Sequence, residues 1–115
     1  MTSGIRTITV PVKDLEAATA MYAKLLGTDP YTSSAYYVGF RPEDSPEIGL
    51  NPNGDVSAGP ITYYHVADIK AKVAELAAAG ATVEQEPRDV GAGGLTAHLR
   101  DGDGNLIGLF QGSDA

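Results

Sequence analysis

The sequence of 115 residues contains no cysteine. Disulfide bonds, thiolate metal sites and a cysteine nucleophile are therefore excluded. No apolar run approaches the roughly 18 residues of a membrane-spanning helix, and the N-terminus lacks the pattern of a signal peptide. We expect a soluble cytoplasmic protein with no membrane partner, and a chain of this length predicts one domain.

Positive charge is also scarce in this sequence. Lys and Arg number 8 against 15 Asp and Glu, which gives a formal net charge of −7. The acidic residues are scattered through the chain and form no block. Such a surface repels phosphate backbones, so we predict no nucleic-acid partner.

The stretch RDGDGNLIGLF at residues 100–110 resembles the start of a calcium loop. Oxygen-bearing side chains alternate there: Asp101, Asp103 and Asn105. A helix-loop-helix calcium loop also needs Gly at its sixth position and Glu at its twelfth, but Leu106 and Gly112 stand at these positions. The stretch therefore predicts a hairpin turn, in which Gly102, Gly104 and Asn105 take positive φ.

The chain repeats its own pattern. ITVPVKDLEAATAMYAKLLG at residues 8–27 matches TYYHVADIKAKVAELAAAG at residues 62–80, with two Asp residues aligned. Each half predicts a strand, a helix and a glycine. Asp14 and Asp68 stand at the expected N-caps, and Gly27 and Gly80 stand where the helices are expected to end in the left-handed conformation.

The two halves also close with the same short strand, IGLNPNG at residues 48–54 and IGLFQG at residues 107–112. Between helix and closing strand each half has room for two further strands. We place them near residues 29–33, 36–41, 82–86 and 95–100. The element order is thus βαβββ twice, which predicts an α+β protein. Its parts are module one at about residues 5–55, a linker at residues 56–60 and module two at about residues 61–112.

These motifs together resemble a known family. A strand ending in V-x-D-L before a helix ending in L-L-G, a second V-x-D strand and helix, and then DGDGNLIGLF are similar to the vicinal oxygen chelate superfamily. Its members include glyoxalase I, extradiol dioxygenases, fosfomycin-modifying enzymes and bleomycin-binding proteins. The resemblance covers the chain from Ile5 to Gln111. It implies one glyoxalase-like domain over residues 1–115, whose paired βαβββ modules form a curled-sheet cleft in a homodimer.

Catalytic members of that superfamily hold a divalent cation in the cleft through the first and last strands of each module. The resemblance places these four ligand positions at Thr7, Gly49, Ile61 and Gly108. Such a cation prefers carboxylate oxygen or imidazole nitrogen, which none of the four provides. We therefore expect no metal and no other cofactor. The remaining candidate ligands elsewhere are Glu47, His65 and His98.

Strand alternation separates residues that face a helix from those that face the cleft. The expected helix-facing residues include Ile8, Val10, Val12, Tyr36, Val38, Phe40, Thr62, Tyr64 and Val66. The residues predicted to contact a ligand are Tyr37, Arg41, Tyr63, His65, His98, Arg100 and Phe110. Aromatic faces with a few polar tips are typical of small-molecule sites. Gly49 and Gly108 are expected to leave the centre open for a flat ligand.

Two classes of function fit this pattern. The first is a metal-independent protein that binds an aromatic or drug-like organic compound, resembling the resistance proteins of the superfamily. The second is a metal-free lyase or isomerase in which His65 or His98 acts as acid or base, and a metal-dependent lyase or dioxygenase is a more remote alternative. No pair of titratable residues stands at a recognisable catalytic spacing, so we predict binding first.

Overall fold

A computed structural model describes residues 2–91 and 93–112 of the chain. It divides the chain into two compact units. We call residues 7–61 module one, and we call residues 2–6 together with residues 62–112 module two. The predicted order βαβββ is present twice, which confirms the α+β class. Among the described residues, no helix is long and apolar enough to cross a membrane.

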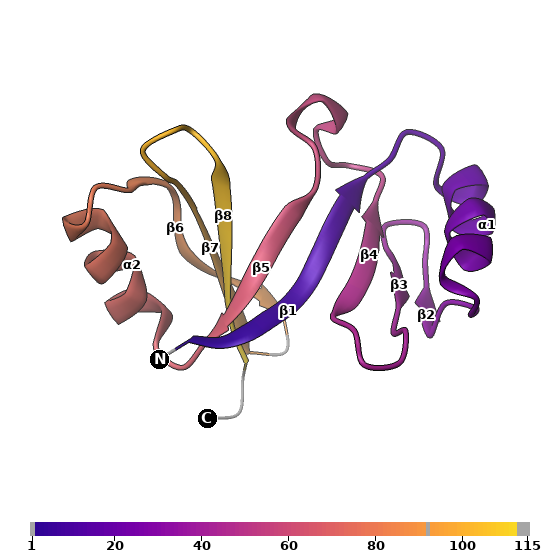
Figure 1. The fold of residues 1–115 in the computed structure, drawn as a ribbon, viewed down its shortest axis with the longest axis horizontal. Coiled ribbons are helices and arrows are strands. Elements are labelled where there is room, and N and C mark those ends of the chain that lie inside the picture. Colours follow the sequence, from indigo (N-terminus) through magenta and orange to yellow (C-terminus); the bar gives the residue numbers. More distant parts are fainter. Residues whose placement is uncertain (1, 92, 113–115) are drawn as a thin grey trace. The chain divides into compact units, whose positions relative to one another are not determined.

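Module one contains one helix and a four-stranded sheet (Figure 1). Its elements are β1 (Thr2–Pro11, from residue 7 onwards), α1 (Leu15–Leu26), β2 (Thr32–Ser33), β3 (Val38–Phe40), β4 (Glu47–Asn51) and the 3₁₀ turn η1 (Val56–Ala58). The strand order is β2-β3-β4-β1, in which only the pairing of β1 with β4 is parallel. Here β2 is shorter than predicted, because Pro30 has no N–H to donate to a sheet.

Helix α1 begins and ends as its sequence predicts. The Asp14 carboxylate accepts a hydrogen bond from the Ala17 N–H at 3.0 Å, and Gly27 ends the helix with φ of 71°. The apolar face of α1 packs on the buried strand residues Val38, Phe40 and Leu50. Tyr36 was predicted to belong to this row, which is wrong. It precedes β3 and is 75% exposed, so strand alternation does not apply to it.

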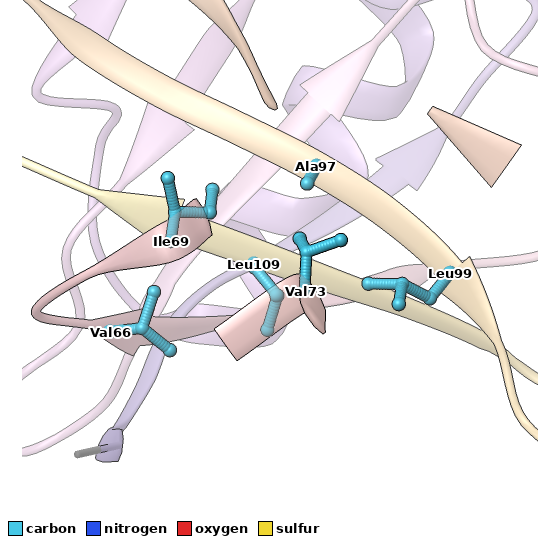
Figure 2. Packing of buried hydrophobic residues seen from close by; sticks show 6 residues of the cluster. All are labelled: Val66, Ile69, Val73, Ala97, Leu99 and Leu109. Carbon is cyan, nitrogen blue, oxygen red and sulfur yellow. The ribbon is translucent and has the colours of Figure 1, made fainter. Parts of the chain in front are cut away.

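Module two repeats the arrangement of one helix on a sheet. Besides the start of β1 it contains β5 (Ile61–Val66), α2 (Ile69–Ala78), β6 (Thr82–Gly91), β7 (Gly94–Arg100) and β8 (Leu106–Gln111). β5 pairs in parallel with β8, and β8-β7-β6 follow as antiparallel neighbours. Figure 2 shows the core between α2 and the sheet, made of Val66, Ile69, Val73, Ala97, Leu99 and Leu109.

Two boundaries in module two differ from their predictions. Helix α2 ends at Ala78 and its cap is Ala79 with φ of −87°, so Gly80 follows the cap, with φ of 113°. Strand β6 continues to Gly91 instead of ending near residue 86. It extends because it forms a hairpin with β7, in which Gly91 pairs with Gly94.

The predicted hairpin turn is present between β7 and β8. The Asp101 carboxylate accepts hydrogen bonds from the N–H groups of Asp103 and Asn105, both at 2.9 Å, and from the Asn105 side-chain amide at 3.1 Å. These bonds, with the Asn105 side chain first, hold the pKa of Asp101 below its ordinary value. Of the three residues predicted to take positive φ, only Gly104 does. Asp101 secures the turn, so Gly102 and Asn105 need no special conformation.

Candidate functional site

A tyrosine–histidine pair crosses the sheet of module two on the face opposite α2. Tyr63 of β5 and His98 of β7 flank Gly108 of β8, and the three residues are in register. Tyr63 Oη lies 2.7 Å from His98 Nε2. The tyrosine ring reaches His98 by lying over Gly108, where a Cβ atom would come within 2.7 Å of Tyr63 Cδ1. The pair therefore needs a residue without a side chain beneath it.

Burial keeps both members of this pair neutral. Removal from water lowers the pKa of His98 below its ordinary value, Glu84 opposes this shift and Arg88 adds to it. Removal from water also raises the pKa of Tyr63, against the influence of Arg88. A neutral imidazole can accept the Tyr63 proton or donate its own, and the histidine tautomer decides which. At neutral pH the His98 imidazole is already unprotonated, so the pair can accept a proton from a ligand.

Module one places a second tyrosine over the equivalent glycine. Tyr37, which precedes β3, donates a hydrogen bond from its hydroxyl to Glu47 Oε2 at 2.5 Å. Its ring lies over Gly49, where a Cβ atom would overlap the hydroxyl oxygen. Glu47 is only 8% exposed, and its register partner Thr7 on β1 is 7% exposed. Both modules thus present a tyrosine bonded to an ionisable partner.

The Glu47 carboxylate of module one has a second aromatic neighbour, Tyr31. Burial first, and a hydrogen bond to Glu47 second, raise the pKa of Tyr31. The guanidinium of Arg41 lies 4.0 Å above the centre of the Tyr31 ring. Arg41 was predicted as a ligand contact, and the structure places it in this aromatic cluster, with its side chain exposed.

The two glycines do not leave open space, so that prediction is wrong. Tyrosine rings fill the positions above Gly49 and Gly108. These are two of the four positions at which the resemblance places metal ligands, and the other two, Thr7 and Ile61, offer one neutral hydroxyl between them. Within residues 2–91 and 93–112, no three His, Asp or Glu side chains lie close enough to hold a metal ion. The donor set does not fit a divalent cation.

Phe110 lies beside the tyrosine–histidine pair of module two. It is in register with His65 of β5, and the centroids of the two rings are 5.7 Å apart. The Arg6 guanidinium lies 4.2 Å from the centre of the Phe110 ring, as a cation–π contact. His65 is exposed and has no hydrogen-bond partner among the described residues. Of the two histidines, only His98 is fixed in orientation by a hydrogen bond.

Arg100, also predicted as a ligand contact, is engaged within its own module. Its Nε donates to Glu84 Oε2 at 2.7 Å and its Nη1 donates to the Gly104 carbonyl at 2.9 Å. These bonds tie β7 to β6 and to the turn before β8. The observed contacts give Arg100 a role in holding the hairpin, and contact with a ligand stays a prediction for this residue.

Sequence reasoning missed Arg88, which lies on the same face as the pair. Arg88 is in register with Thr96, and Thr96 with Phe110, so the three lie in one row across β6, β7 and β8. The register of β6 shifts between Gln85 and Arg88. Alternation cannot be counted across such a bulge, so the face of Arg88 cannot be predicted from the sequence pattern.

A family model described as the Glyoxalase/Bleomycin resistance protein/Dioxygenase superfamily matches residues 4–109. The chain belongs to this superfamily. Among solved structures, it is similar to methylmalonyl-CoA epimerase from Mycobacterium tuberculosis, at 18% identity and a TM-score of 0.74, over 96% of this chain and 89% of that one. It is also similar to a variant of Streptomyces coelicolor methylmalonyl-CoA epimerase in complex with 2-nitronate-propionyl-CoA. The identity is 19% and the TM-score 0.80, over 100% of this chain and 98% of that one.

A third superfamily structure is the Mn(II)-bound glyoxalase from Novosphingobium aromaticivorans. It is 23% identical with a TM-score of 0.72, over 96% of this chain and 39% of that one. A comparison with curated proteins by sequence found no match. At these identities the structural likenesses show the fold that superfamily members share.

We predict that Gly108→Ala separates Tyr63 from His98. The new Cβ would lie 2.7 Å from Tyr63 Cδ1 and 2.9 Å from the Thr62 carbonyl oxygen, so ring or backbone must move. We expect a loss of about 1–3 kcal/mol in the free energy of unfolding, measured with urea, as for other overpacked sites. The control is Gly102→Ala, where nothing lies within 4 Å of the new Cβ. Equal stability of the two variants would contradict the ring placement.

Proposed function

We propose that this protein binds a small aromatic or drug-like organic molecule and does so without a resident metal ion. The observation that carries the proposal is the tyrosine over each glycine of the closing strands. At these positions the superfamily resemblance leads us to expect metal ligands, and here a phenol ring takes up the space. Each module therefore presents an aromatic ring with a polar hydroxyl at this position in place of a metal site.

The residues around each tyrosine support binding of an organic compound. Module two offers the faces of Tyr63, His98 and Phe110, with one phenol and one imidazole able to orient a ligand by hydrogen bonds. Small-molecule sites combine apolar and aromatic lining with a few such polar groups. Solved superfamily structures with bound CoA thioesters show that the fold accommodates organic ligands.

We expect ligand binding to survive removal of metal ions. A thermal-shift screen of aromatic natural products, antibiotics and small acids should give ligands that raise the Tm by mass action. Their affinities should be the same before and after dialysis against EDTA, because within residues 2–91 and 93–112 no three His, Asp or Glu side chains lie close enough to hold a metal ion. Elemental analysis showing close to one metal ion per chain after dialysis, with affinity lost on chelation, would contradict the proposal.

One observation favours a second candidate, a metal-free enzyme that moves a proton at an acidic C–H bond. His98 is neutral, half-buried and bonded to Tyr63, so the pair can act as a general base. Tyr63 Oη would take the proton from carbon while its own proton passes to His98 Nε2. The substrate is left as an enolate, and return of the proton regenerates the pair.

The enzyme candidate predicts exchange of a substrate proton with solvent. Methylmalonyl-CoA is a reasonable probe, since similar structures are epimerases that act on it. In D₂O, the α-hydrogen should be lost in NMR spectra, and His98→Gln should slow this exchange about a hundredfold or more. His65→Gln, the control, should leave it unchanged. The rate should fall as the pH drops through the lowered pKa of His98, because protonation removes the base.

We also propose that the protein is a homodimer, and its cytoplasmic location stays a prediction. Met21 and Leu25, one turn apart on α1, are 62% and 73% exposed, which leaves apolar surface for a second copy. Sedimentation equilibrium at tens of micromolar, a range suited to weak association, should give twice the chain mass. A single species at the mass of one chain would overturn this part of the proposal.

A further inference from the structure

The position of Arg88 bears on the charge of the ligand. Arg88, Thr96 and Phe110 lie in one row across module two, beside the row that holds the Tyr63–His98 pair. Residues paired in register on neighbouring strands point to the same face of a sheet. Thr96 precedes the buried Ala97, which faces α2, so the Arg88 side chain lies on the opposite face, together with the tyrosine–histidine pair.

Two of the three carboxylates near Arg88 on β6 accept hydrogen bonds, and the third, Glu86, is exposed. Glu84 receives the Arg100 guanidinium at 2.7 Å, and Asp89 accepts a hydrogen bond from the Gly91 N–H at 2.7 Å. Arg88 itself is exposed and forms no ion pair with any residue that the structure describes. Its charge reaches the pair: it opposes the rise that burial causes in the pKa of Tyr63, and it adds to the fall that burial causes in the pKa of His98. A guanidinium with no ion-pair partner among the described residues thus stands beside two neutral polar groups and an aromatic ring.

We propose that Arg88 binds the carboxylate of an organic acid whose apolar part contacts Phe110. This inference rests on the proposed function and names the class of ligand. A guanidinium matches a carboxylate through two parallel N–H donors, and these charge-assisted bonds are stronger than neutral ones. Tyr63 and His98 add hydrogen bonds without adding charge. A cationic ligand would be repelled by Arg88 at this face.

Three small probes of similar size and different charge test the proposal: benzoate, benzamide and benzylamine. Isothermal titration of the full chain at low salt should rank benzoate first and benzylamine last. Arg88→Gln should weaken benzoate about tenfold, the size expected for loss of one charge-assisted contact, and leave benzamide unchanged. Arg88→Lys should keep part of the affinity, because it retains the charge and loses the planar fork. Raising the salt concentration should weaken benzoate alone.

Lys70→Gln is the matched control. It removes the same charge from an exposed position on α2, which covers the other face of the sheet. It should leave benzoate affinity unchanged. Both substituted side chains are exposed, so the Tm should remain close to that of the parent chain and unfolding should not confuse the result.

The outcomes separate this inference from the proposed function. If benzoate and benzamide bind equally, or if Arg88→Gln behaves like Lys70→Gln, the inference is overturned while binding itself stands. If none of the three probes binds, the inference is also overturned. The proposed function falls with it only if the wider screen of aromatic compounds finds no ligand either.

Discussion

A tyrosine ring can lie over a neighbouring strand at this distance only where that strand has no side chain beneath the ring. Gly108 and Gly49 meet this requirement on the closing strands of the two modules, and Tyr63 and Tyr37 use it. Each ring carries its hydroxyl to a partner on another strand of the same module. The geometry of both polar pairs depends on the missing Cβ.

The two pairs are alike in construction and differ in chemistry. His98 is a base that burial keeps neutral, whereas Glu47 is an acid that receives hydrogen bonds from tyrosine hydroxyls. A duplicated scaffold has therefore acquired two different polar centres. Module two also carries the guanidinium of Arg88 beside its pair, so the two sheets present different charges to an approaching molecule. Their equivalence is a property of the backbone and does not extend to the side chains.

Much of this fold could be predicted from the sequence, because the repeat, the capping Asp residues and strand alternation are local signals. They correctly assign Phe40 to the helix side and Tyr63 to the opposite side. Alternation specifies a face and gives no rotamer, so it could not show that a ring turns sideways over a glycine. It also fails across the bulge before Arg88. Ring direction and bulge position depend on contacts between strands, which no single segment encodes.

Strand β1 belongs to both compact units. Residues up to Arg6 group with the second half of the chain, and residues from Thr7 onwards group with the first. Arg6 covers the Phe110 ring, so the later half is incomplete without a piece of the earliest sequence. Dividing the chain at the linker would therefore yield two fragments that do not correspond to the modules. The later fragment would contain Phe110 without the Arg6 side chain that lies over its ring. The repeat is visible in the sequence, but no single cut between its two halves separates the two compact units.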